Sequence, residues 1–326
     1  MIASPHVAVR VFSPTHCPSC GESAERAFRD RLRHGEDFLV RGCRICGHQV
    51  LQRCPALPFD GDDEFEPVIL DRYIRAMKES RQAAARTILK AVAREKPAQG
   101  KLLDVGASFG WLVEEALRAG WEAEGIEPSS IACDAARRQG LPVSRGFFPD
   151  DLREVGRRWE AITLMDVLEH LEQPIEILAA IRSRLSPDGV LALQVPNSRG
   201  LFLRVSKGLV RATSGRLAGP LLRMYQTQFS YPHLHYFHPD NMHRLLSRAG
   251  FQVLNICPTP TIAGATADRV GYLKPEYAGV PSSGLISQAM IWGSSVINVA
   301  AQITGLHDTF YCIARPDRRP SACQAA

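Results

Sequence analysis

Short apolar runs alternate with amphipathic segments through most of the chain after residue 100. The runs are rich in Leu, Ile, Val and Ala, and in the segments between them apolar residues recur every three or four positions, which is typical of helices. The runs predict strands at 102–105, 122–126, 141–143, 161–165, 190–195, 251–256 and 309–314. The segments between them predict helices at 111–119, 129–139, 174–185 and 239–249. Such alternation predicts an α/β fold, with a mainly parallel sheet covered by helices on both faces.

The first hundred residues have a different pattern. Residues 15–54 are rich in Cys, Gly and Arg, an acidic stretch follows at 60–64, and residues 67–96 carry apolar positions at helical spacing. A serine-proline-aspartate-glycine turn at 186–189 is expected to feed the fifth strand. The predicted organisation is a metal-binding module at 1–60, a helical linker or lid at 61–99, and an α/β domain at 100–326 with insertions at 198–238 and 258–307.

Residues 283–306 contain no charged residue, which raises the question of a membrane span. The segment also holds two Gln, an Asn and several Gly and Ser residues, so a buried or interfacial helix is the expectation. The first fourteen residues lack the apolar run of a signal peptide. Together with a net charge of only +5, these features indicate a cytoplasmic protein and exclude neither a small-molecule nor a macromolecular partner.

Nine cysteines include two CxxCG knuckles, Cys17 with Cys20 and Cys43 with Cys46. The two knuckles lie at nearly the spacing of a four-cysteine zinc ribbon. Four thiolates leave no open coordination position, so the predicted Zn²⁺ is structural. The nearby His48 and Cys54 are interpreted as residues that do not bind the metal.

A glycine-rich turn joins the first predicted strand of the α/β domain to its first helix. The sequence Leu-Leu-Asp-Val-Gly-Ala-Ser-Phe-Gly at 102–110 suits a ligand approaching the helix N-terminus. Gly106 and Gly110 do not fit the dinucleotide fingerprint G-x-G-x-x-G. The turn does satisfy G-x-S-x-G, which would make Ser108 a hydrolase nucleophile, but several strands should then precede it. Asp104 would also have no role in a hydrolase.

Four motifs together resemble the class I S-adenosylmethionine-dependent methyltransferases, and most closely the small-molecule type of ubiquinone biosynthesis. They are Asp-Val-Gly with Gly110, the acid Glu127 about 20 residues later, Asp-Val-Leu-Glu-His at 166–170, and the turn at 186–189. The resemblance implies a Rossmann-like seven-stranded sheet and S-adenosylmethionine as cofactor. Ser108 departs from the family, which usually has glycine there. The implied cofactor-binding residues are Asp104, Gly106, Ala107, Ser108, Gly110, Glu127, Pro128, Phe147 (or Phe148), Asp166 and Val167.

Three histidines lie within residues 231–238, Tyr-Pro-His-Leu-His-Tyr-Phe-His. Histidine titrates near neutral pH and is suited to removing a proton from a hydroxyl acceptor. Related small-molecule methyltransferases have a similar stretch at the mouth of the cofactor pocket. We therefore expect His233 or His235 to be the base, with His170 and Tyr231 as supporting donors.

The insertion at 198–230 carries six basic residues and no acidic one. A basic amphipathic helix is predicted there, and its apolar face is expected to hold Leu201, Phe202, Val205, Leu209 and Val210. It suits an anionic or carrier-linked small-molecule acceptor, or contact with an anionic membrane surface.

The expected function is methylation of a small molecule, sugar, polysaccharide or secondary metabolite, with O-methylation favoured over C- or N-methylation. Similar zinc ribbons precede methyltransferase domains in bacterial enzymes of this kind. RNA methylation is the alternative enzyme activity, although the ribbon lacks an aromatic surface for stacking bases. A non-catalytic protein that binds the cofactor or a partner is the alternative of another class.

Overall fold

The computed structural model describes residues 9–34, 38–55, 67–152, 156–226, 231–259, 292, 296 and 299–318. Its larger sheet has seven strands in the order β11-β12-β9-β8-β5-β6-β7. Strands β5 to β9 run parallel, and β12 lies antiparallel between β9 and β11. The strands are β5 (Lys101–Val105), β6 (Glu122–Glu127), β7 (Val143–Arg145), β8 (Trp159–Met165), β9 (Leu185–Pro196), β11 (Phe251–Thr259) and β12 (Thr309–Pro316). The predicted α/β class and seven strands are confirmed.

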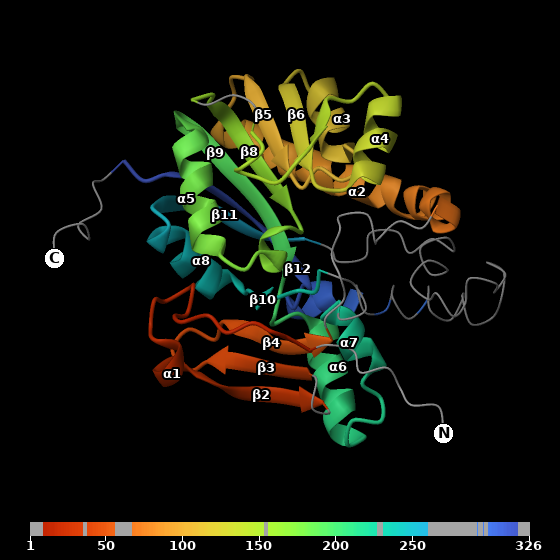
Figure 1. Ribbon diagram of the computed structural model, residues 1–326, viewed down its shortest axis with the longest axis vertical. Coiled ribbons are helices and arrows are strands. Elements are labelled where there is room, and N and C mark those ends of the chain that lie inside the picture. The colour runs from red at the N-terminus through yellow and green to blue at the C-terminus, as the bar shows by residue number, and fades with distance from the viewer. Residues whose placement is uncertain are drawn as a thin grey trace.

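Helices cover both faces of this sheet (Figure 1). The helices are α2 (Pro67–Glu95), α3 (Trp111–Arg118), α4 (Ser130–Arg138), α5 (Pro174–Arg184) and α8 (Pro239–Arg248), with a short 3-10 helix η1 (Leu168–His170). Neighbouring residues of a strand point to opposite faces, so Leu102 packs with α2 and α3 while Leu103 packs with α5 and α8. Because both faces are covered, the central strands are almost wholly apolar.

The turn predicted at 186–189 lies within β9. Leu185 pairs with Trp159 and Val190 pairs with Ala161, and the register shifts between these pairs. The strand therefore begins before the proline and glycine and bulges through them, because Leu185 and Val190 are both buried on the sheet.

A smaller sheet contains the cysteine-rich segment and lies below the larger one in Figure 1. It is built from β1 (Val9–Val11), β2 (Phe28–His34), β3 (Phe38–Cys43) and β4 (Gln49–Pro55), with the short helix α1 (Ala24–Ala27) before β2. A fifth strand, β10 (His235–Tyr236), comes from the predicted catalytic segment and pairs antiparallel with β4. The cysteine module and the α/β domain thus share a sheet.

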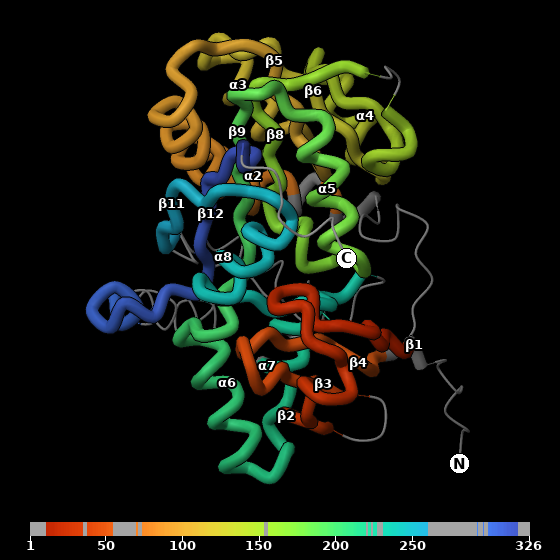
Figure 2. The backbone as a smooth tube through the Cα atoms, turned by 90° about the vertical axis from the view of Figure 1, so that its left-hand side faces the viewer, coloured from red at the N-terminus to blue at the C-terminus, as the bar shows by residue number. Residues whose placement is uncertain are grey.

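The insertion after β9 folds into α6 (Leu201–Ala212) and α7 (Gly219–Met224), which pack beside this smaller sheet (Figure 2). The predicted helix is confirmed, but only part of its predicted apolar face is packed. Val205 is 55% exposed and Leu209 37% exposed. Val210 is buried as predicted, and Leu203, which was not predicted, is buried with it in a cluster with residues of β3 and β4. The surface that α6 covers belongs to the cysteine module.

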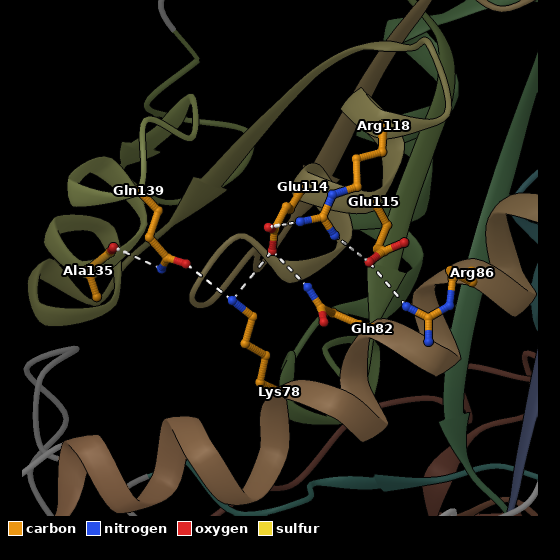
Figure 3. Close-up of polar contacts among 8 residues, drawn as sticks. All are labelled: Lys78, Gln82, Arg86, Glu114, Glu115, Arg118, Ala135 and Gln139. Carbon is orange, nitrogen blue, oxygen red and sulfur yellow. Dashed lines mark hydrogen bonds and ion pairs between the residues drawn. The ribbon is translucent and has the colours of Figure 1, made fainter.

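The long helix α2 is linked to α3 by hydrogen bonds and ion pairs between polar side chains (Figure 3). Gln82 donates to Glu114 at 2.7 Å, and Arg86 pairs with the buried Glu115 at 3.2 Å. Arg118 pairs with both of these glutamates. This network holds the middle of α2 beside the helix that follows the glycine turn.

The charge-free segment at 283–306 lies mostly outside the described residues. Among the helices that the structure describes, none is both long enough and apolar enough to cross a membrane.

Candidate functional site

The glycine turn between β5 and α3 has a left-handed backbone at three positions. The φ angles are 72° at Gly106, 48° at Ser108 and 74° at Gly110. A Cβ atom on Gly106 would lie 2.5 Å from Cγ2 of Val167, so glycine is required there by contact as well as by conformation. Left-handed backbone at Ser108 explains in physical terms why glycine is favoured at this position. Ala107 is buried beneath the turn.

Glu127, at the end of β6, holds this turn in place. Its Oε2 accepts a hydrogen bond from the Ser108 backbone N–H at 2.8 Å, and its Oε1 accepts one from Ser129 N–H at 2.9 Å. Pro128 separates Glu127 from Ser129, which caps α4. The predicted acid therefore lies directly beside the glycine turn, where a ribose diol bound by the turn would be within its reach.

Asp104 lies under the turn and is only 2% exposed. Its Oδ1 accepts a hydrogen bond of 2.6 Å from the Thr163 hydroxyl of β8. Burial raises the pKa of Asp104 to about 7, the Thr163 hydrogen bond opposes this rise, and the nearby charge of Glu127 adds to it. A buried carboxyl poised near neutral pH is typical of a functional site.

Asp166, at the end of β8, has a left-handed backbone with a φ of 57°. Its carboxylate pairs with Arg81 of α2 and accepts a hydrogen bond of 3.3 Å from Gln194. Arg81 was missed by the sequence reasoning, because only the fold brings α2 over the ends of the strands. The predicted lid therefore contacts the site through a charged pair.

The two candidate aromatic residues after β7 differ in exposure. Phe147 is 53% exposed, whereas Phe148 is partly buried against the core of the α/β domain. Phe147 is also fixed by its backbone N–H, which donates to Asp151 at 2.8 Å. The more accessible ring is therefore the one first predicted to lie near the adenine.

Two of the predicted histidines meet beside the end of β8. The rings of His170 and His233 are 4.7 Å apart in an edge contact, and Tyr231 lies 5.6 Å from His170. Buried Glu169 lies 3.9 Å from Nε2 of His233. Neither Glu169 carboxylate oxygen has a hydrogen-bond partner among the described residues. Glu169 is part of the motif at 166–170, but the sequence analysis gave it no role. The feature that could have indicated one is its position directly before His170.

Burial shifts the pKa values of both Glu169 and His233. It raises the pKa of Glu169 well above its usual value, with the charge of Asp166 adding to the effect. It lowers the pKa of His233 well below its usual value, as does nearby His170. The lowered pKa leaves the His233 imidazole uncharged at neutral pH, so that it can accept a proton. Glu169, His170 and His233 also offer ligand atoms within 4.8 Å of one another, so they could hold a metal ion.

His235 faces the cysteine module. Its Nδ1 lies 3.0 Å from Nε2 of His48, and Nδ1 of His48 lies 3.2 Å from the Ser19 hydroxyl. All three residues are buried, and burial lowers the pKa of His235 to about 4. The sequence prediction treated His233 and His235 alike, whereas the structure gives them different neighbours.

The four predicted cysteine ligands converge. Cys17 Sγ lies 3.5 Å from Cys46 Sγ, and Cys20 Sγ lies 3.7 Å from Cys43 Sγ. Tetrahedral zinc with Zn–S bonds of about 2.3 Å separates its sulfurs by about 3.8 Å. A hydrogen bond from the Cys17 thiol lowers the pKa of Cys46 to about 5. The side chains of this group therefore fit a four-thiolate metal site, and neither His48 nor Cys54 is part of it.

A glycine turn after β5 and an acid at the end of the neighbouring strand β6 define a nucleoside-binding α/β protein. Residues 77–256, more than half of the chain, match the family described as "Methyltransferase domain". The chain belongs to this methyltransferase family.

Two bacterial relatives are ubiquinone biosynthesis O-methyltransferases. The protein of Actinobacillus pleuropneumoniae is 33% identical over 107 residues, 30% of this chain and 46% of that protein. The protein of Cereibacter sphaeroides is 27% identical over 160 residues, 47% of this chain and 61% of that protein. The chain thus spans about half the length of the relatives it matches. The solved complex between the Haloferax volcanii Trm112 methyltransferase activator and a methyltransferase contains a chain with the same fold, at 14% identity and a TM-score of 0.50, covering 75% of this chain and 95% of that one.

Proposed function

We propose that this protein transfers a methyl group from S-adenosylmethionine to a hydroxyl of a small molecule. The observation that carries the proposal is the buried Glu169–His233 pair beside the end of β8, next to Asp166 and the glycine turn. The likeness to O-methyltransferases of ubiquinone biosynthesis supports the same type of acceptor. C- or N-methylation remains the alternative chemistry for the same site.

S-adenosylmethionine fits the residues that surround the turn. Glu127 would accept hydrogen bonds from the ribose hydroxyls, Phe147 would contact the adenine, and Asp104 with Gly106 would hold the amino-acid part. When bound, the cofactor supplies an electrophilic methyl group on a positively charged sulfur. The protein's main task is to hold the acceptor oxygen in line with that methyl group, which can supply about 7–11 kcal/mol.

His233 would remove the acceptor proton. Its imidazole is uncharged at neutral pH and can accept a proton, and the Glu169 carboxyl group lies 3.9 Å from its Nε2. His170, in edge contact with His233, and Tyr231 border the same space. His235 would instead fix the segment to the cysteine module through His48.

Cofactor binding is expected to weaken as the pH falls through about 7. The folded protein holds the pKa of Asp104 at about 7, and its protonation removes the negative charge that attracts the cofactor's ammonium group. Titration calorimetry with S-adenosylhomocysteine between pH 5.5 and 8.5 measures this. The Asp104→Asn variant should bind weakly with little pH dependence across this range; an unchanged pH profile in that variant would assign the effect to another group.

The acceptor class is tested by label transfer. Tritiated S-adenosylmethionine is incubated with the protein and with small-molecule, RNA and protein fractions of the source cells, and label is expected in the small-molecule fraction. Label confined to RNA would establish the alternative enzyme activity. Cofactor binding without transfer to any fraction would favour the non-catalytic alternative.

His233→Ala should lower the rate of transfer by about 100-fold or more, the usual contribution of general base catalysis. The matched control is His243→Ala on α8, because His243 is exposed and outside the cluster. His235→Ala should reduce stability more than the rate measured per folded molecule. If replacing both His233 and His235 leaves turnover intact, the histidine assignment is wrong.

We also propose that Cys17, Cys20, Cys43 and Cys46 bind one structural Zn²⁺. The short distances between their sulfurs support four-thiolate coordination. The purified protein should contain one zinc per chain by atomic absorption.

A further inference from the structure

A cluster of three basic side chains lies where the cysteine module meets helix α6. Lys207 and Arg211 are one helical turn apart on α6, and Arg31 comes from β2. None of the three forms an ion pair with a carboxylate anywhere in the described parts of the chain. Like charges held together repel one another, so a bound anion would stabilise the cluster.

Two local features of the smaller sheet direct the Arg31 side chain toward helix α6. The β2–β3 register shifts between Asp30 and Leu32, so Arg31 is the extra residue of a β-bulge and has no partner on β3. Its side chain then lies over Gly42, where a Cβ atom would be 2.7 Å from Cγ of Arg31. Only a residue without a side chain at 42 leaves room for this path.

Gly42 is also the point where Lys207 approaches. The partner of Gly42 on β4 is Gln49, and Nζ of Lys207 donates to Oε1 of Gln49 at 3.0 Å. Lys207 is largely withdrawn from water, which lowers its pKa to about 8, and the charges of Arg211 and Arg31 add to this. A partly desolvated ammonium with two guanidinium groups nearby is suited to a doubly charged anion.

We propose that Arg31, Lys207 and Arg211 bind a phosphate or diphosphate group, through the bulge that turns Arg31 over Gly42 toward Lys207. Gln49, which contacts Lys207, pairs in the sheet with Tyr236, and the Tyr236 ring lies 5.9 Å from that of His233. A phosphate bound here can therefore belong to the methyl acceptor. This last step rests on the proposed function, whereas the anion site itself does not.

The test uses titration calorimetry with sodium pyrophosphate on the full chain, without cofactor. The wild type should bind, and Lys207→Gln should lower the affinity at least tenfold. Arg211→Gln should have the same direction of effect and serves as the second variant if Lys207→Gln does not fold. Arg216→Gln is the matched control, because it removes one positive charge from the same insertion but lies outside the cluster. Its affinity for pyrophosphate should stay within twofold of that of the wild type.

A second arm identifies the source of the phosphate. Vesicles of phosphatidylcholine with phosphatidylglycerol are sedimented with the wild type and with Lys207→Gln. Lys207-dependent sedimentation without pyrophosphate binding assigns the site to a lipid headgroup, and pyrophosphate binding alone assigns it to a soluble phosphate. Absence of both, or equal losses in Arg216→Gln, overturns the proposal. S-adenosylhomocysteine binding, measured in parallel, should be the same in all variants. A negative result for the anion site would therefore not contradict the proposed methyltransferase function.

Discussion

Removing the metal ion proposed for the four-cysteine module is expected to loosen residues 231–238, which carry the proposed base. Each knuckle is tied to the α/β domain. The Cys46 carbonyl lies 3.1 Å from Nε2 of His238, and Arg248 of α8 donates to the Cys17 carbonyl at 3.1 Å. Strand β10 pairs with β4 directly after the second knuckle. Structural zinc sites in small peptides contribute about 10–16 kcal/mol, so the apo module should lose its fold.

Hydrogen exchange followed by mass spectrometry measures this effect. After zinc is removed with a strong chelator, exchange should rise in 38–55 and in 231–238, while the strand at 101–105 should stay protected. Cys43→Ser should act like the chelator. Cys257→Ser is the isosteric control, because Cys257 lies on β11 outside the module. Unchanged protection of 231–238 in the zinc-free protein would show that the module does not position this segment.

A variant at the contact between His48 and His235 distinguishes loss of the metal from loss of the connection between the cysteine module and residues 231–238. His48→Asn should keep one zinc per chain, because His48 is not in the sulfur cluster. Losing a buried hydrogen bond between neutral groups costs about 1 kcal/mol, which corresponds to roughly fivefold faster exchange in 231–238. Loss of zinc in this variant would mean that His48 is a ligand.

Glu127→Gln is expected to lower the affinity for S-adenosylhomocysteine by about 100-fold, since hydrogen bonds to a charged group contribute about 1.5–3 kcal/mol each. The variant would lose the carboxylate that pairs with the two ribose hydroxyls. An amide cannot accept hydrogen bonds from the backbone N–H groups of both Ser108 and Ser129 while it also faces a diol. Calorimetry at pH 8 measures the change.

The control for this prediction lies on the same strand. Glu122→Gln also removes one negative charge from β6, but Glu122 is exposed at the other end of the strand and pairs with Arg157. Its affinity for S-adenosylhomocysteine should stay within about twofold of the wild type, well under 1 kcal/mol. Equal effects in both variants would indicate a change of net charge and not a contact with the ribose.

The fold was largely predictable because its signals are local. Apolar runs that are buried on both faces of a parallel sheet, and the glycines needed for left-handed backbone at Gly106 and Gly110, can be read from neighbouring residues alone. The acid Glu127 was predicted from the resemblance to methyltransferases, and its place at the end of β6 brings it beside the glycine turn. The cysteine ligands were given by their spacing and now lie together.

Other parts of the site depend on contacts between distant segments. Arg81 reaches Asp166 only because α2 packs across the sheet, 85 residues away in sequence. The packed face of α6 was predicted only in part, because a periodic pattern shows that a helix has an apolar side, but not which surface will cover it. Arg31 lies over Gly42 only because of a β-bulge that the sequence pattern did not predict.

The sequence by itself determined the class of the fold, the glycine turn and the two cysteine pairs, because each is set by residues close together in the chain. The tertiary structure decided which neighbours each of the two histidines has. His233 and His235 are two residues apart and chemically identical, yet one lies beside Glu169 and the other beside His48. Burial and neighbouring charge set what a histidine can do, and both come from segments far away in sequence.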